Sequence, residues 1–337
     1  MKYSRMALIG LIISFVTILV IIRLTETSLT WKALFSANWK YLSIAVLLQV
    51  LFLFLWGLRL KLIASCIGYD IPITYTFKIS LASAFLAAIT PSSAGGEPLR
   101  IKMLANSGAN YGEATAAVLA ERVLDAVFFS ISLPIFVLIS GITTGLRVAL
   151  IFAFFFSTFL LILYAIFKDE GNIKKISSFV YWIVSKVKDE KLGKRVSNRA
   201  ESEMMNFRLA AIELLKNRFH RILALFISTV LIWTSLFLIP SFILLSLNCE
   251  PFFLLSYTVQ LIVCVISLIP LTPGSSGIAE VSAAYFYSSF IPSHLLGTLI
   301  GIWRVVTYYF SMLIGFLANV SIIRDLQKAK CVVESPE

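Results

Sequence analysis

The chain has 337 residues, of which 59% are hydrophobic and 14% are charged, and its formal net charge is +11. The mean hydropathy of +0.90 excludes an ordinary soluble domain, in which about half of the residues are apolar and about a quarter are charged. The basic residues stand between apolar segments and not on one soluble face. They therefore act as orientation signals in a membrane and do not indicate a nucleic-acid partner.

Apolar segments recur along the whole chain, and several reach the roughly 20 residues that a membrane-crossing helix needs. They cover residues 6–22, 41–58, 74–89, 113–140, 146–167, 222–247, 253–270, 278–291 and 295–323. The first follows Lys2 and Arg5 as the apolar part of a signal peptide would, but no cleavage pattern of small residues comes after it. We expect this segment to be kept as the first helix.

Two of the segments are short and end in residues that break helices. TPSSAGGE at 90–97 follows the segment 74–89, and TPGSSGIAE at 272–280 follows the segment 253–270. Irregular backbone cannot face lipid, because its amides and carbonyls would have no partners there. The sequence therefore predicts two re-entrant helical hairpins, at 74–107 and 253–291. A pair of short full spans at each place is the alternative, and the charge pattern fits both.

The distribution of charge predicts the topology. With the N-terminus in the cytoplasm, 23 basic residues lie inside, four lie outside and two lie within the membrane. We expect an all-α integral membrane protein of the cell membrane, with about six full transmembrane helices, two re-entrant hairpins and both termini cytoplasmic. Its halves, 41–167 and 222–325, flank a cytoplasmic connector at 168–221. Within it, residues 174–196 form either an amphipathic helix on the inner leaflet or a solvated link.

The two hairpins belong to a longer repeat. Glu97 precedes Arg122 by 25 residues, and Glu280 precedes Arg304 by 24. In both halves the arginine falls inside the long helix after the hairpin, and the topology opens the two hairpins toward opposite sides. An inverted repeat with broken helices is typical of alternating-access transporters, whose substrate site lies near the middle of the membrane.

Charged residues in hydrocarbon persist where they are paired, wetted or functional. Arg122 and Arg304 are the candidates for binding a phosphate or carboxylate, because a guanidinium offers donors in a matching fork. Glu97 and Glu280 either pair with these arginines in the empty site or bind the protons or cations that drive transport. Glu121 and Asp125 share a helix face, and Asp125 can also pair with Arg122; both carboxylates are candidates, with a structural salt bridge as the alternative.

The two interrupted loops supply the remaining candidates. Their backbone amides are predicted to add anion-binding donors at the start of the outgoing half-helix, and a tight turn is the alternative. The residues concerned are Ser92, Ser93, Gly95, Gly96, Gly274, Ser275, Ser276 and Gly277. Arg100, on the arm after the first hairpin, is expected to reach the interface and attract anionic headgroups, or simply to follow the positive-inside pattern.

The sequence offers no metal or cofactor motif. Cys66, Cys249, Cys264 and Cys331 have no paired spacing, and His220 and His294 are isolated. We expect no metal and no cofactor. The expected partners are membrane lipids with anionic or phosphate headgroups, and self-association into a homo-oligomer stays open.

These motifs together resemble a known family. TPSSAGGEPLRIKMLANSG, AERVLD, LTPGSSGIAE and WRVV look like the membrane domain of lysyl-phosphatidylglycerol synthases, across residues 6–325. In bifunctional members this domain moves an aminoacylated phospholipid between leaflets, and a soluble domain attaches the amino acid. Only 12 residues follow Asp325, so the transferase activity is not expected here.

By resemblance, five residues match the charged positions of the family: Glu97, Arg122, Asp125, Glu280 and Arg304. The residues 274–277 depart from it, because family members often have a run of glycines there. The resemblance implies a lipid translocase, not an enzyme, for an anionic or aminoacylated phospholipid or an isoprenoid phosphate. An intramembrane lipid-modifying enzyme, such as a lipid-linked glycosyltransferase, and a small-solute secondary transporter are the alternatives.

Overall fold

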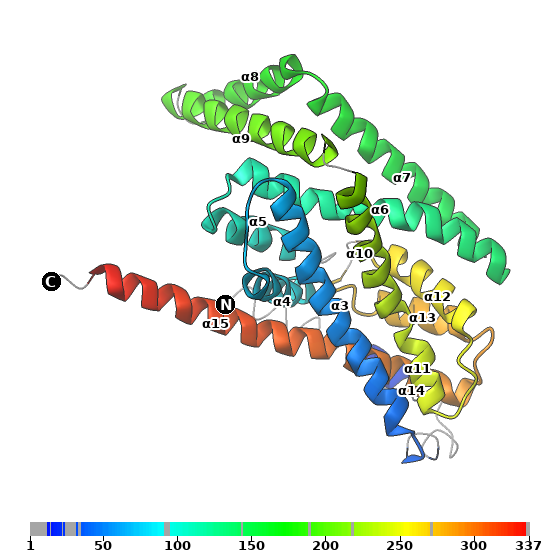
Figure 1. Cartoon of the computed structure of the whole chain (residues 1–337). Helices are drawn as coiled ribbons and strands as arrows, with labels where there is room; N and C mark the ends of the chain where they lie inside the picture. The colour runs from blue at the N-terminus through cyan, green and yellow to red at the C-terminus, as the bar shows by residue number, and fades with distance from the viewer. Residues whose placement is uncertain are drawn as a thin grey trace.

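The computed structural model describes residues 12–13, 15–21, 23, 32, 35–90, 95–142, 144–187, 190–216, 219–269 and 272–334. Over these residues the protein is built from α-helices and contains no β-strand (Figure 1). Of the expected first helix, residues 6–22, the structure describes 12–13 and 15–21, and these residues are helical.

The helices follow one another with short connections. The first half contains α3 (Trp39–Cys66), α4 (Ile73–Ile89), α5 (Gly96–Asn106), α6 (Tyr111–Ser140) and α7 (Thr144–Phe167). The connector forms α8 (Glu170–Val187) and α9 (Glu190–Lys216). The second half contains α10 (Phe219–Phe237), α11 (Ile239–Ser246), α12 (Phe253–Ile266), α13 (Ile278–Tyr287), α14 (Ser293–Arg304), a π-helical turn (Val305–Tyr309) and α15 (Phe310–Glu334).

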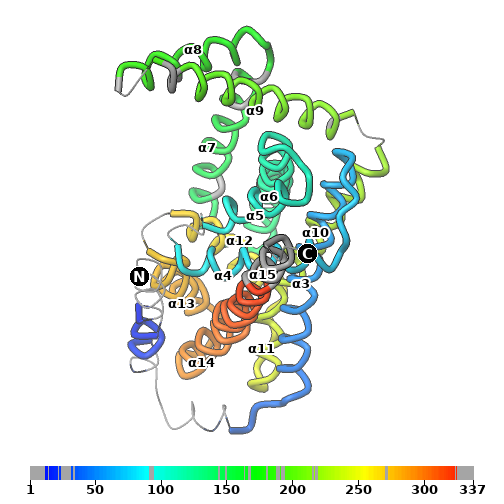
Figure 2. Tube along the Cα trace, turned by 90° about the vertical axis from the view of Figure 1, so that its left-hand side faces the viewer, coloured from blue at the N-terminus to red at the C-terminus, as the bar shows by residue number. Residues whose placement is uncertain are grey.

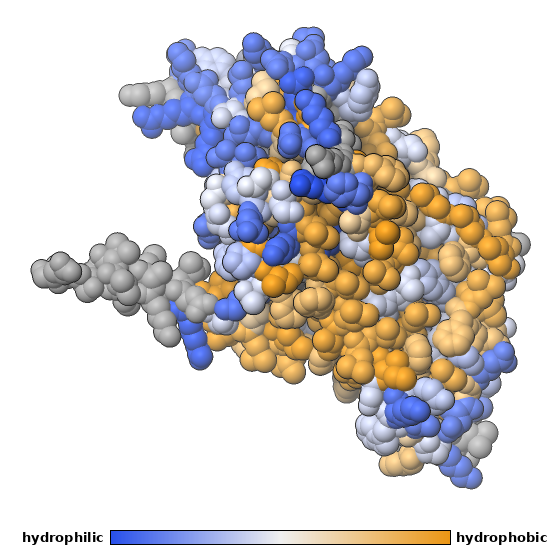
Figure 3. Space-filling view, viewed as in Figure 1, coloured by the Kyte–Doolittle hydropathy of each residue, from blue (hydrophilic) through white to orange (hydrophobic). Residues whose placement is uncertain are grey.

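The described residues include five helices that are long and apolar enough to cross a membrane. They cover Trp39–Cys66, Tyr111–Ser140, Gly145–Ile162, Phe219–Ser246 and Ser293–Ile322. Large apolar side chains lie on the outside of the body, where Figure 3 shows a broad hydrophobic surface between two polar ends. Only 6% of Gly145–Ile162 is buried within the chain, so α7 turns nearly all of its apolar surface outward. This confirms the predicted all-α membrane fold.

The predicted interruptions fall between short helices. The apolar helix α4 has 17 residues and α12 has 14, and each is followed by a loop and a second short helix, α5 or α13. Each pair of short helices packs together and is followed by a longer helical stretch that carries Arg122 or Arg304. The two halves therefore share their order of elements, as the spacing of the motifs predicts.

Small residues let the helices cross closely. A Cβ atom at Gly57 of α3 would lie 2.8 Å from Phe77 Cα of α4, and one at Gly315 of α15 would lie 2.5 Å from the carbonyl oxygen of Leu81. Asn319 of α15 also donates a hydrogen bond to the Ala82 carbonyl, at 2.9 Å. Close backbone approach of this kind is how helices associate where apolar surface alone gives no preference for protein over lipid. It joins α4 of the first half to α15 of the second.

The connector is a pair of helices that lies over α6 (Figure 2). The stretch 174–196, predicted as one amphipathic helix or as a solvated link, is divided between α8 and α9. Ser177 and Ser197 bond to one another across the pair, with 2.8 Å between their hydroxyl oxygens. The stretch is therefore not covered by one helix, because α8 ends at Val187 and α9 begins at Glu190.

Polar contacts fix the start of α6. Glu113 accepts hydrogen bonds from its own cap, the Asn110 amide at 2.8 Å, and from the Tyr69 hydroxyl at 2.6 Å. The bond to this carboxylate raises the pKa of Tyr69, because it favours the neutral phenol. Glu203 of α9 accepts from the Gly112 amide at 2.6 Å. Two carboxylates thus meet the positive end of the α6 dipole.

Gly112→Ala tests the contact of α9 with α6. An added Cβ would lie 2.1 Å from the Glu203 carbonyl oxygen, so the two backbones must separate. We expect a loss of about 1–3 kcal/mol in the free energy of unfolding, as in other overpacked sites, measured in detergent. Gly301→Ala is the matched control, because its Cβ would make an ordinary 3.6 Å contact with Ile18. Equal stability of the two variants would contradict the packing described here.

Candidate functional site

The middle of α6 carries the charges of the site. Glu121, Arg122 and Asp125 lie within two turns of one another, and the first and last share a face of the helix. Their side chains are 0%, 36% and 8% exposed, respectively. Two carboxylates are therefore buried in an apolar body, where they must be partnered to be tolerated.

Asp125 has partners on three helices. Its Oδ1 accepts hydrogen bonds from Arg59 Nη1 of α3 at 2.6 Å and from Trp233 Nε1 of α10 at 2.9 Å. Its Oδ2 lies 3.3 Å from Arg122 Nη1 on the preceding turn of α6. Arg59 also donates to Thr229 Oγ1 of α10 at 3.1 Å. This single carboxylate therefore holds α3, α6 and α10 together.

Glu121 has two arginine partners. Its Oε1 lies 3.4 Å from Arg59 Nε, and its Oε2 forms an ion pair with Arg100 Nη2 of α5. The Arg100 guanidinium also lies over the ring of Trp56, 4.8 Å from its centroid. Cation–π contacts of this kind stabilise a desolvated guanidinium.

Arg100 was expected to reach the membrane interface or to follow the positive-inside pattern, and Arg59 was not among the candidate residues, but the structure buries both. Each is only 1% exposed. Arg59 is buried because α3 continues to Cys66, two turns beyond the predicted end of the segment, and turns Leu60 and Ile63 inward beside it. Arg100 does not reach the interface, because the short helix α5 folds back onto α6. The sequence did contain a signal for the burial of Arg59, because apolar residues continue at helical spacing after it.

Glu97 and Arg122 form the accessible part of the cluster. Arg122 Nε lies 3.3 Å from Glu97 Oε1, and the two side chains are 36% and 44% exposed. Glu97 stands in the first turn of α5, directly after the first break. The pairing of these residues is one of the two alternatives that their spacing left open.

The second half contains the equivalent pair. Arg304 Nη2 lies 2.8 Å from Glu280 Oε2, and Glu280 is fully buried. The same carboxylate oxygen accepts from the Gly277 amide at 2.7 Å, so Glu280 caps its own helix, α13. The Arg304 guanidinium lies 5.1 Å from the ring centroids of both Trp303 and Tyr308.

The two interrupted loops meet. The Gly274 amide of the second loop donates to the Thr90 carbonyl of the first at 3.0 Å, and the Tyr308 hydroxyl donates to the Ala88 carbonyl at 3.0 Å. Gly274 has a φ of +56°, and a Cβ there would lie 2.5 Å from the Ala88 oxygen. Only glycine allows this approach at this φ.

The amides of the second loop are already occupied. Gly274, Ser275, Ser276 and Gly277 donate to Thr90, Thr272, Pro273 and Glu280, respectively. The second loop therefore presents none of these four amides to a ligand, contrary to the sequence-based hypothesis. In the first loop the Gly95 amide donates to Thr90 Oγ1 at 2.8 Å, and Gly96 packs against the Ser83 carbonyl. Ser92 and Ser93 lie outside the described residues.

Charge in this site is balanced. Three guanidinium groups, of Arg59, Arg100 and Arg122, face three carboxylates, of Glu97, Glu121 and Asp125. Among the residues that the structure describes, no group of three or more His, Cys, Asp or Glu side chains is placed to hold a metal ion. The cluster is thus an ion-pair network between helices, with one accessible edge.

These features define a multi-pass α-helical membrane protein with ion pairs buried between two interrupted helix pairs. The chain belongs to the family described as the lysylphosphatidylglycerol synthase TM region, whose model matches residues 7–315. It is 44% identical to a UPF0104 membrane protein of Archaeoglobus fulgidus over 321 residues, and this match covers 94% of this chain and 98% of that relative. It is 29% identical to one of Methanocaldococcus jannaschii, over 95% of this chain and 96% of the relative.

Glu121→Ala tests whether the buried pairs hold the fold. Removing this carboxylate leaves two buried guanidinium groups short of a partner, and loss of one member of a buried pair costs about 3–5 kcal/mol. Glu97→Ala is the matched control, because its pair is more than a third exposed and is worth about 1 kcal/mol or less. The measurement is the free energy of unfolding of each purified variant. A larger loss for Glu97→Ala would refute this division of the cluster.

Proposed function

We propose that the protein is a lipid translocase that moves a lipid with an anionic or phosphate-bearing headgroup between the two leaflets of the cell membrane. The observation that carries the proposal is the partly exposed Arg122, which pairs with Glu97 in the first turn after the first helix break. Glu97 Oε1 lies 3.3 Å from Nε of this guanidinium. Of the three arginines in the cluster, Arg122 is the most accessible to solvent. Membership of a family named for a lipid synthase supports a lipid substrate.

The lengths of the short helices support re-entrant hairpins. At about 1.5 Å per residue, α12 and α13 extend roughly 21 Å and 15 Å, less than the roughly 30 Å of hydrocarbon. The helix α5, with 11 residues, is also too short. In the proposed mechanism the two hairpins enter from opposite sides and touch at Thr90 and Gly274. Rocking one half against the other would then open the headgroup site to each leaflet in turn.

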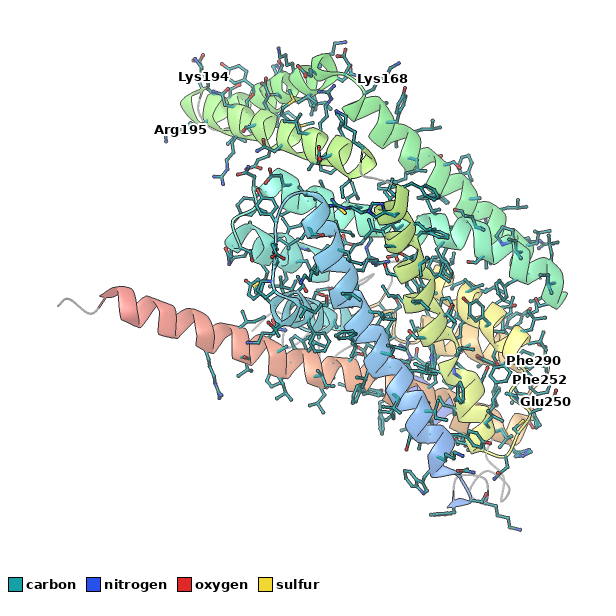
Figure 4. The ribbon with its side chains drawn as sticks, in the orientation of Figure 1. Lys168, Lys194, Arg195, Glu250, Phe252 and Phe290 are labelled. Atoms are coloured by element: carbon teal, nitrogen blue, oxygen red, sulfur yellow. The ribbon has the colours of Figure 1, made fainter. Side chains whose placement is uncertain are left out.

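The charge at the two ends supports a cytoplasmic connector. Lys168, Lys194 and Arg195 lie at the end formed by α8 and α9, and Glu250 lies at the opposite end (Figure 4). Basic residues of short connections collect on the cytoplasmic side. We therefore assign α8 and α9 to the cytoplasm.

Arg122→Ala tests the proposed function. We expect the transfer of fluorescently labelled phosphatidylglycerol across liposomes, measured by dithionite quenching, to fall to the rate of protein-free liposomes. Arg122→Lys should recover only part of the rate, because an ammonium cannot bind a phosphate in the forked geometry. Arg208→Ala is the control, since Arg208 pairs with Glu170 on the connector, away from the cluster. An unchanged rate in a folded Arg122→Ala variant would refute the site.

A further inference from the structure

The two Glu–Arg pairs are equivalent in sequence but differ in exposure. In the second half the side chains of Glu280 and Arg304 are 0% and 7% exposed. In the first half those of Glu97 and Arg122 are 44% and 36% exposed. A pair of this accessibility contributes little to stability and can separate, whereas a buried pair cannot separate without leaving a charge unpartnered.

The contacts of the two carboxylates differ in the same way. Glu280 Oε2 is held by both the Gly277 amide and Arg304, and that guanidinium lies against two aromatic rings. For Glu97, the contact that the described residues provide is one at 3.3 Å, to Arg122 Nε. Rotating the Glu97 side chain away therefore breaks a single contact and moves its charge into water.

The charge balance of the first cluster requires a group that can leave. Its three guanidinium groups already face three carboxylates, so an incoming anion would give the cluster a net negative charge. Glu121 and Asp125 cannot leave, because they are 0% and 8% exposed and each contacts more than one partner. Among the described residues of the cluster, Glu97 combines access to water with contact to one partner, Arg122.

We propose that Glu97 is an exchangeable counter-ion: it occupies on Arg122 the place of a phosphate-type headgroup and moves into water when the headgroup binds. Glu280, its counterpart in the repeat, is a fixed structural group. The inference rests on the proposed function and assigns the first half as the half that accepts the headgroup. It also explains how an apolar body holds an arginine ready for an anion while the site is empty.

Binding measurements on purified full-length protein in detergent test the exchange. Glu97→Gln and Glu280→Gln are titrated calorimetrically with dihexanoyl phosphatidylglycerol and, in a separate arm, with inorganic phosphate. We expect Glu97→Gln to bind about twofold to fivefold more tightly than the wild type, the range that an exposed ion pair is worth. Glu280→Gln should gain no affinity and should melt at a lower temperature, because its carboxylate is buried.

The two arms distinguish the source of the anion. A gain with both ligands identifies the phosphate group itself as the occupant of Arg122, and a gain with phosphatidylglycerol alone identifies the lipid headgroup as a whole. Glu97→Ala guards against a new hydrogen bond from glutamine: it should show the same gain. A gain in the glutamine variant alone overturns the exchange.

Unchanged or weaker binding in both Glu97 variants, at wild-type melting temperature, also overturns the proposal. This failure differs from a failure of the proposed function, which the transfer assay reports separately. If Arg122→Ala abolishes transfer while the Glu97 variants bind as the wild type does, the translocase stands and the exchange does not. If the wild type moves no lipid, the translocase itself is refuted.

Discussion

Buried charge that must be partnered is the constraint on which the rest of the structure depends. Glu121 and Asp125 lie in the middle of an apolar helix, and their partners come from α3, α5 and α10. Leaving such a carboxylate unpaired costs several kcal/mol, more than most single apolar contacts contribute. The network therefore specifies how these helices assemble around α6, a specification that apolar surface alone does not supply in lipid.

In the second half, close backbone contacts and hydrogen bonds to the backbone specify how the helices assemble, as ion pairs do in the first half. Close approach at Gly315 and the hydrogen bond from Asn319 fasten α15 onto α4. The Gly274 amide and the Tyr308 hydroxyl fasten the second loop onto the end of the same helix. The two halves of the repeat thus interlock through α4, and the buried Glu280–Arg304 pair joins α13 to α14. Similar sequence motifs thus lie in different surroundings in the two halves.

Much of this architecture could be predicted, because apolar length and helix-breaking residues are local properties. The segments, the two interruptions and the connector follow from them. The Glu97–Arg122 and Glu280–Arg304 contacts were anticipated by a spacing of 25 and 24 residues. The burial of Arg59 and Arg100 was not predicted, because it depends on contacts with the carboxylates of Glu121 and Asp125, which are distant in the sequence. The occupation of the Gly274 amide was missed for the same reason, because its acceptor is Thr90 in the other half, whereas the next three amides donate to acceptors within a few residues.

The π-helical turn at Val305–Tyr309 determines which side chains of α15 point toward α4. An α-helix advances by about 100° per residue, and a π turn accommodates one residue more than a regular turn. Arg304 can therefore face Glu280 while Gly315 and Asn319, farther along, face α4. If one residue were removed from this turn, the C-terminal part would swing by about a quarter of a rotation and present bulkier side chains to α4. The extra residue thus corrects the helical register between the surface that meets Glu280 and the surface that meets α4, which an uninterrupted α-helix would point in the wrong relative directions.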